Sequence, residues 1–346
     1  MNPLIWSLLI TSLSTSTIIT AASYHWLLAW IGLELNTLSI LPIIMKPHHP
    51  RATEAATKYF IIQTLAAAMI LFASTLNAWK TGHWVISNTE NPLLTTTITM
   101  AIMLKLGTAP THLWYPEILQ GASLNTALII STWQKIAPLT MLYMMHNNLP
   151  NTLLLLIGLL SALIGGWAGL NQTQMRKILA HSSIAHMGWL LFALSMNEPL
   201  ATLTLATYIM MTTAMFSSLN MTNTKTITDM GTTWTTSPTM LTLTLLILTS
   251  LGGLPPMTGF MPKLLILYSL TTTNLLSLAT LLAFASLPSL FFYIRMAHMT
   301  TLTTPPTTTN TTHKWRLKTA PPPHLAITAT LSLMLLPLTP ALWMTI

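Results

Sequence analysis

The chain has 346 residues and a formal net charge of +8, with 52% hydrophobic and only 6% charged residues. Because its mean hydropathy is +0.61 and apolar runs of about 20 residues recur along it, the composition excludes a soluble globular domain and predicts a polytopic helical membrane protein. The sequence contains no cysteine, which excludes disulfides, iron–sulfur clusters and thiolate-held haem in this chain.

The apolar segments predict an all-α fold of about eleven transmembrane helices. In chain order they lie near residues 3–22, 26–45, 54–79, 93–121, 124–146, 149–170, 174–196, 200–222, 238–272, 274–298 and 324–344. The fourth and the ninth are too long for one span, and both contain helix breakers. These breakers are Pro110 in the fourth helix and Gly252, Gly253, Pro255, Pro256 and Gly259 in the ninth. Both helices are therefore predicted to be interrupted.

Basic residues are concentrated on one side of the predicted bundle. Loops on the same side as the N-terminus carry Lys46, Arg51, Lys58, Arg176, Lys177, Lys225, Arg295, Lys314, Arg316 and Lys318, whereas the opposite side carries Lys80. Under the positive-inside rule, this asymmetry predicts that the N-terminus lies on the positive-inside face and the C-terminus on the other. It also attributes the net positive charge to membrane topology, so we expect no nucleic-acid partner.

The order of the helices predicts an internal repeat. The interrupted helices stand five positions apart, and an odd offset means that corresponding helices cross the membrane in opposite directions. We therefore predict one transporter-like transmembrane domain over residues 1–346, with two inverted repeats at about 3–146 and 149–298. A linker near 299–323 and a final helix near 324–344 complete the chain. Matched interruptions in two halves are typical of transporters with an ion path at the bilayer midplane.

Four ionisable residues stand alone in these apolar segments. They are Glu34, Lys105, Lys135 and Lys263. A charge at the centre of a spanning helix costs about 2.5–3.5 kcal/mol on insertion scales, so such residues usually face a bundle interior or a water-filled path. The alternative is that each lysine snorkels to the membrane interface. That alternative fits poorly with three isolated lysines that lie beside helix breakers or proline.

Two histidines are candidate relay groups, because a neutral imidazole can both donate and accept a proton. His112 follows Pro110, so an alternative for His112 is that it bonds the carbonyls that this break frees. The second candidate is His186. It stands five residues after His181, roughly 140° around a helix, which does not match the spacing of a histidine pair that shares a metal ion. We therefore expect no metal site.

Three stretches carry a family resemblance. They are KLGTAPTHLWYPE at 105–117, NQTQMRKILAHSSIAHMG at 171–188 and GGLPPMTGFMPK at 252–263. In these motifs the chain resembles the antiporter-like subunits of respiratory complex I, and its length and helix count are similar to those of animal mitochondrial members of that family. In those members three N-terminal helices of the bacterial counterpart are missing, which agrees with the helix count above.

The resemblance implies roles for the four buried charges. Glu34 and Lys105 match the family's input ion pair, Lys135 its central lysine and Lys263 the lysine after the second break. Burial favours the neutral form of a lysine and a nearby carboxylate favours the charged form, so Lys105 is expected to hold its proton while Glu34 is close. We expect Glu34 and Lys105 to interact across their helices. We also expect Lys135 and Lys263 to lie on one polar line through the region of His186.

The resemblance further implies a core membrane-arm subunit of NADH:ubiquinone oxidoreductase in the mitochondrial inner membrane. Its N-terminus would face the matrix and its C-terminus the intermembrane space. NADH, FMN, iron–sulfur clusters and ubiquinone would be bound by partner subunits, and this chain would bind no cofactor. Its expected partners are other membrane-arm and accessory subunits and phospholipids, cardiolipin among them. Two alternatives remain open: a free-standing cation/proton antiporter, and a non-pumping scaffold of the membrane arm, for which the buried charges would be dispensable.

Overall fold

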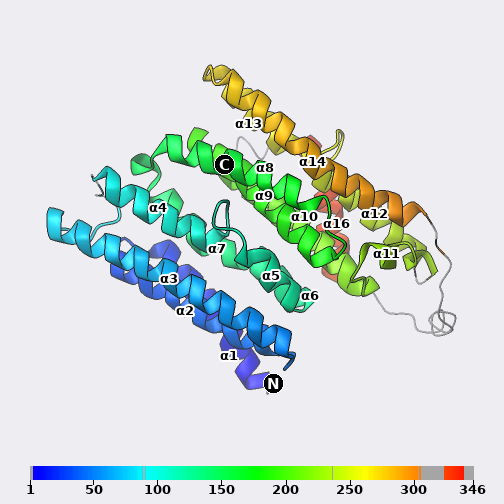
Figure 1. Ribbon diagram of the computed structural model, residues 1–346, viewed down its shortest axis with the longest axis horizontal. Coiled ribbons are helices and arrows are strands. Elements are labelled where there is room, and N and C mark those ends of the chain that lie inside the picture. The colour runs from blue at the N-terminus through cyan, green and yellow to red at the C-terminus, as the bar shows by residue number, and fades with distance from the viewer. Residues whose placement is uncertain are drawn as a thin grey trace. The chain divides into compact units, whose positions relative to one another are not determined.

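The computed structural model describes residues 3–87, 89, 91–235, 237–302, 304 and 323–338. Within these ranges the regular secondary structure is helical (Figure 1). Seven of the described helices are long and apolar enough to cross a membrane, and shorter apolar helices add to them. The chain is therefore an all-helical, multi-pass membrane protein, as its composition predicts.

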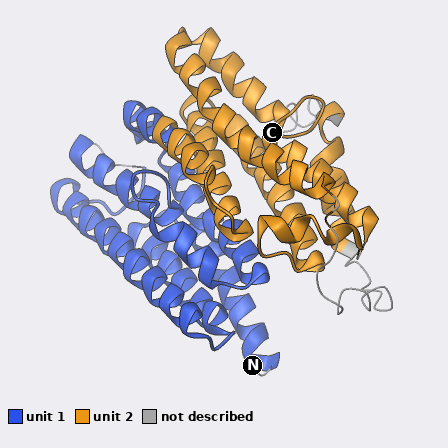
Figure 2. Ribbon diagram, turned by 45° about the vertical axis from the view of Figure 1, so that its right-hand side comes forward, with its two compact units in different colours: residues 1–158 blue, residues 159–346 orange. Residues whose placement is uncertain are grey.

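The chain forms two compact units, residues 1–158 and 159–346 (Figure 2). Unit 1 contains α1 (Pro3–Ala22), α2 (Trp26–Met45), α3 (Pro50–Thr81), α4 (Pro92–Leu106), α5 (Trp114–Gly121), α6 (Leu124–Ser131) and α7 (Trp133–Met144). The boundary between the units falls within α8 (Asn151–Gly169). Unit 2 continues with α9 (Met175–Met196), α10 (Glu198–Thr222), α11 (Ile227–Met230), α12 (Pro238–Gly252), α13 (Phe260–Thr272), α14 (Leu276–Thr301) and α16 (Pro323–Met334).

Each unit packs its helices around buried small and apolar side chains. In unit 1, α2 contacts both α1 and α3, α3 contacts α4 and α5, and α7 contacts α4. In unit 2, α12 contacts α14 and α10, and α10 contacts α9 and α16. Large apolar side chains such as Leu8, Phe72 and Phe284 remain exposed on the outer faces of these helices. This pattern is typical of helices that turn an apolar surface toward lipid.

The two predicted helix interruptions are confirmed. The first lies between α4 and α5 and the second between α12 and α13. Both α4 and α12 have 15 residues, begin with proline at the first helical turn and end at a glycine in the left-handed conformation. Gly107 has φ 72° and ψ 39°, and Gly253 has φ 75° and ψ 39°. Each glycine donates its N–H to carbonyls of the preceding turn, and an L side chain at these angles would be strained.

The two interruptions also share the same register along the chain. The same number of residues separates Pro92 from Pro238, Gly107 from Gly253, and Trp114 from Phe260. The prolines that follow each turn lie at corresponding positions too, in the cis peptides Ala109–Pro110 and Pro255–Pro256. Two distant segments of the chain therefore build the same turn from similar residues.

The prediction of one continuous helix over residues 124–146 is wrong. α6 ends at Ser131 and α7 begins at Trp133, with Thr132 between them at φ −111° and ψ −68°. The Thr132 hydroxyl donates to the Leu128 carbonyl at 2.7 Å, and such side-chain bonding competes with the helical ladder and bends the helix. This third interruption lies just before Lys135.

The C-terminal part of the chain differs from the prediction in the end of α14, and its last residues lie outside the described part of the chain. α14 continues to Thr301, past the predicted end at 298, so the predicted linker begins later. Apart from Leu302 and Thr304, its remaining residues up to 322 lie outside the described residues. The final helix, predicted over 324–344, is described as α16 and a 3₁₀ turn at Leu336–Leu338. Residues 339–346 lie outside the described part of the chain.

Candidate functional site

A small internal cavity in unit 1 contains the first group of predicted site residues. Lys105 from α4 and Lys135 from α7 both line it, together with residues of α2, α3, α5 and α6. About 20 Å³ of this cavity is open to the centre of a water molecule. A cavity needs roughly 10–15 Å³ by this measure to hold one water, so this cavity, which both lysines line, has room for a water molecule.

Lys105 lies in the last turn of α4, directly before the turn at Gly107. Its side chain is buried, and among the described residues its ammonium group has no hydrogen-bond partner. Its main-chain carbonyl accepts a hydrogen bond from Gln63 of α3 at 3.3 Å. The indole N–H of Trp114, which lines the same cavity, is likewise buried and unbonded within the described residues. Both groups are donors, so an acceptor such as water suits this cavity.

Glu34 is half-buried on α2. Lys105 lies on α4, and α3 contacts both of these helices. Its carboxylate accepts a hydrogen bond from the Thr37 hydroxyl at 2.8 Å. It interacts electrostatically with Lys105 and with Tyr59 of α3. Within the described residues the ion pairs under 4.0 Å join Lys58 to acidic partners, so the interaction of Glu34 with Lys105 acts over a longer distance.

Lys135 is buried in the first turn of α7. Its ammonium group lies 5.0 Å from the centre of the Tyr115 ring, within the range of a cation–π interaction. Pro138, one turn further on, has no N–H to donate to the carbonyl of Gln134. The Lys135 turn is therefore weakened on both sides, by Thr132 before it and by Pro138 after it.

Lys263 belongs to unit 2 and lies on α13, just after the second interruption. Its ammonium group donates to the Gly252 carbonyl at 2.9 Å. Pro256 has no N–H to donate to this carbonyl, so the lysine uses an acceptor that the break leaves free. A Cβ atom on Gly253 would lie 2.8 Å from the ammonium group, so the absence of a side chain there lets the lysine pass. Lys263 and Trp189 line a mainly apolar groove of about 480 Å³.

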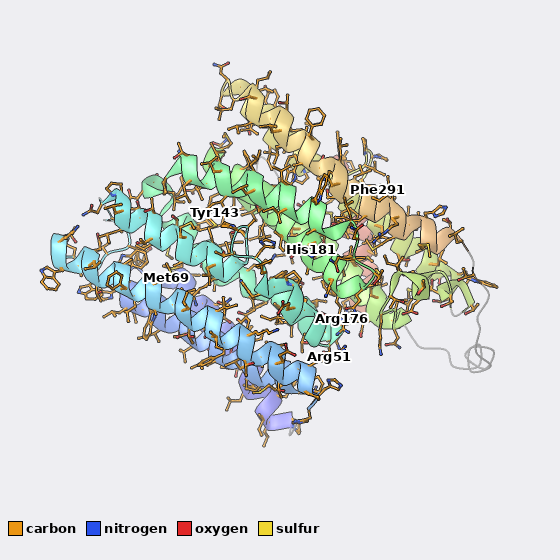
Figure 3. The ribbon with its side chains drawn as sticks, in the orientation of Figure 1. Arg51, Met69, Tyr143, Arg176, His181 and Phe291 are labelled. Carbon is orange, nitrogen blue, oxygen red and sulfur yellow. The ribbon has the colours of Figure 1, made fainter. Side chains whose placement is uncertain are left out.

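The predicted histidines lie in different surroundings. His112 is buried in the segment between α4 and α5 and interacts with the main chain at Pro110, and both of its predicted roles stay predictions. His186 lies on α9 in unit 2, with its Nε2 3.4 Å from the Tyr293 hydroxyl. His181 lies on the same helix (Figure 3). Within the described residues no group of three or more His, Cys, Asp or Glu side chains gathers as a metal site.

The sequence analysis did not identify the polar residues that surround the first cavity. Gln134 of α7 donates to Asn36 of α2 at 3.1 Å and accepts from the Tyr59 hydroxyl at 3.2 Å. Together with Gln63, these residues bring amide and hydroxyl groups to the wall that Lys105 and Lys135 share. Their polarity within apolar helices could have identified them, because a polar group in a membrane-spanning segment needs a hydrogen-bond partner there.

Comparisons with known proteins match the whole length of the chain. A family model described as "NADH:quinone oxidoreductase/Mrp antiporter, TM" matches residues 23–289, and one described as "NADH dehydrogenase subunit 2 C-terminus" matches residues 290–343. NADH-ubiquinone oxidoreductase chain 2 of Oncorhynchus mykiss is 53% identical over 345 residues, covering 99% of this chain and 98% of the relative. The same chain of Carassius auratus is 53% identical over 343 residues, covering 99% of each.

Solved structures give the same class. A chain of "Respiratory complex I from Thermus thermophilus with bound Aureothin" has a TM-score of 0.85 and 25% identity, over 98% of this chain and 79% of that one. A chain of "Structure of Mrp complex from Dietzia sp. DQ12-45-1b" shares the fold, with a TM-score of 0.76, 16% identity, and coverage of 83% and 59%. The fold with its buried lysines is that of an antiporter-like membrane subunit. Within that class, this chain belongs to the NADH-ubiquinone oxidoreductase chain 2 family.

Proposed function

We propose that this chain is a core subunit of the membrane arm of respiratory complex I. It couples NADH-to-ubiquinone electron transfer in partner subunits to proton translocation across the mitochondrial inner membrane. NADH, FMN, iron–sulfur clusters and ubiquinone are bound by those partners, and this chain carries protons. Family membership supports assembly into this complex over a free-standing cation/proton antiporter.

The observation that carries the proposed chemistry is the cavity shared by Lys105 and Lys135. A water molecule there accepts a proton from the Lys105 ammonium group and passes one to a neutral Lys135. Glu34 controls the first step, because its negative charge favours the charged form of Lys105 while the two interact. When Glu34 and Lys105 move apart, desolvation favours release of the proton. A movement of charge in unit 1 is thereby converted into a proton transfer.

Unit 2 contributes the later part of the proposed path. Lys263 is the terminal group and His186, beside the Tyr293 hydroxyl, is a relay group. The two matched interruptions support two repeats, residues 3–146 and 149–298, in inverted orientation. The link between the lysines of the two units is part of this proposal and rests on the family resemblance.

Replacing Lys135 with methionine tests the relay against the scaffold. Methionine removes the charge at similar volume, so we expect the complex to assemble but to pump protons at a rate at least about tenfold lower per assembled complex, because the acceptor after Lys105 is gone. The measurement is proton uptake or release per NADH oxidised in inner-membrane vesicles. The matched control is K58M, which removes a half-exposed lysine with two surface partners. Equal proton stoichiometry in K135M and K58M would favour the scaffold.

The proposed topology places the N-terminus in the matrix, and the distribution of basic residues supports this orientation. Because the chain has no cysteine, a single introduced cysteine reports the side of its loop. His48 and His83 are exposed and lie in loops at opposite ends of α3. A membrane-impermeant maleimide should label H83C in intact mitoplasts, and H48C only after the inner membrane is opened. The reverse labelling pattern would overturn the orientation.

A further inference from the structure

Four polar residues form a connected set around the unit 1 cavity, which we call the amide clasp. They are Asn36, Tyr59, Gln63 and Gln134. Gln134 is the centre of the set, since its amide nitrogen donates to Asn36 at 3.1 Å and its amide oxygen accepts from Tyr59 at 3.2 Å. One turn along α3 from Tyr59, Gln63 donates to the main-chain carbonyl of Lys105 at 3.3 Å. Side chains of α2, α3 and α7 and the backbone of α4 are thus linked.

Three members of the clasp lie beside a group of the proposed relay. Asn36 follows Glu34 by two residues on α2, and Gln134 directly precedes Lys135. Gln63 holds the carbonyl of Lys105 itself. The clasp therefore connects the backbones that carry the three charged groups of the proposed relay in unit 1.

The backbone of α7 gives Lys135 little support of its own. Thr132 interrupts the helix before this turn, and Pro138 cannot bond the carbonyl of Gln134. A helix turn that lacks the ladder bond to the Gln134 carbonyl relies more on side-chain contacts for its position. Gln134 makes two such contacts, with partners on two different helices, and both partners are buried. No bulk water is available there to replace a lost bond.

We propose that Gln134 is a positioning residue, which holds the Lys135 turn against α2 and α3 so that Lys105 and Lys135 border the same water-sized cavity. This inference rests on the proposed relay. The Gln134 amide oxygen accepts a hydrogen bond from the Tyr59 hydroxyl, and its amide nitrogen donates one to Asn36, so Gln134 uses both ends of its amide to hold two other helices. The Tyr59 hydroxyl donates to Gln134 and not to Glu34, which leaves the Glu34 charge available to Lys105.

The test is the substitution Gln134→Met in the intact respiratory complex. Methionine has a similar shape and loses both hydrogen bonds. We expect normal assembly, proton pumping roughly tenfold slower per assembled complex, and a larger solvent deuterium isotope effect, because proton transfer across a misplaced cavity becomes limiting. Y59F removes one bond of the clasp and should give a smaller loss in the same direction. The control is T140V on the same helix, whose hydroxyl bonds only its own turn and whose loss should change nothing.

The outcomes separate positioning from folding and from the relay itself. Pumping and isotope effects in Q134M equal to those in T140V would overturn the positioning role. So would a loss of activity in Y59F and Q134M that is fully accounted for by less assembled complex. If Q134M does not assemble, an increased isotope effect in assembled Y59F supports the proposal and an unchanged one overturns it. If proton pumping is impaired in K135M but normal in Q134M, the positioning role of Gln134 is wrong and the relay stands. If pumping is normal in K135M, the relay itself is wrong.

Discussion

Replacing Gly259 with alanine is expected to prevent stable assembly of this subunit. A Cβ atom at this position would overlap the carbonyl oxygen of Ser250, which is a main-chain atom of α12 and cannot rotate away. The segment between α12 and α13 would have to open, and Lys263 would lose its fixed position over Gly253. Overpacking of this kind costs about 1–3 kcal/mol in well-packed cores, and overlap with backbone belongs at or above the upper end.

The control for G259A is G252A, a few residues earlier in the same region. The nearest neighbours of a Cβ atom on Gly252 are atoms of the Tyr293 side chain, 3.8 Å away, which is ordinary van der Waals contact. The measurement is the amount of assembled complex and its half-life during heating. G259A should give little assembled complex and G252A a near-normal amount. Similar levels of both variants would contradict the close approach of Gly259 to Ser250.

Glu34→Gln and Lys105→Met are expected to lower coupled proton pumping strongly, each by about tenfold or more, and not to add in the double variant. Glutamine removes the charge that favours protonated Lys105, and methionine removes the group that carries the proton. Once either is absent, the electrostatic interaction between them is gone, so the second substitution has little left to remove.

This double-mutant cycle needs proton pumping per assembled complex for the unmodified protein, E34Q, K105M and the double variant. E117Q is the matched control, because Glu117 is an exposed carboxylate that pairs with Lys58 at the protein surface. We expect E117Q to change pumping little, since exposed ion pairs contribute about 0–1 kcal/mol. Losses in E34Q and K105M that simply multiply in the double variant would show that the two residues act independently.

The interrupted helices could be predicted because their cause is local. Proline lacks an N–H and glycine adopts the left-handed conformation easily, and at each break the two residue types lie close together. A single proline, as in α2 and α14, leaves the helix continuous. The break at Thr132 could not be predicted in this way. Threonine is common in this chain, and its effect depends on whether its hydroxyl bonds back to the preceding turn. The sequence shows that a hydroxyl is present but not which carbonyl it bonds.

The candidate site was only partly accessible from the sequence. Isolated charges such as Lys105 and Lys135 are conspicuous in apolar segments, and they do share a cavity. The role of Gln134 was hidden, because a hydrogen bond to Asn36 and Tyr59 depends on the rotation of three helices about their axes. Composition and spacing within one helix carry no information on that rotation. The positions of the two units' lysines along one path stay a prediction for the same reason.

The shared turn at Gly107 and Gly253 also bears on the history of the chain. Duplication of an ancestral half-protein would leave α4 and α12 equal in length and the two turns in equal register. In that register, the residue that corresponds to Lys105 is Leu251, and the one that corresponds to Lys263 is Glu117. The backbone turn is thus common to both halves while the charges beside it are not. After such a duplication, both halves would keep the glycine–proline turn, while the ionisable residues beside it would change separately in each half. Each half would then acquire its own charged groups without a change in the backbone that holds them.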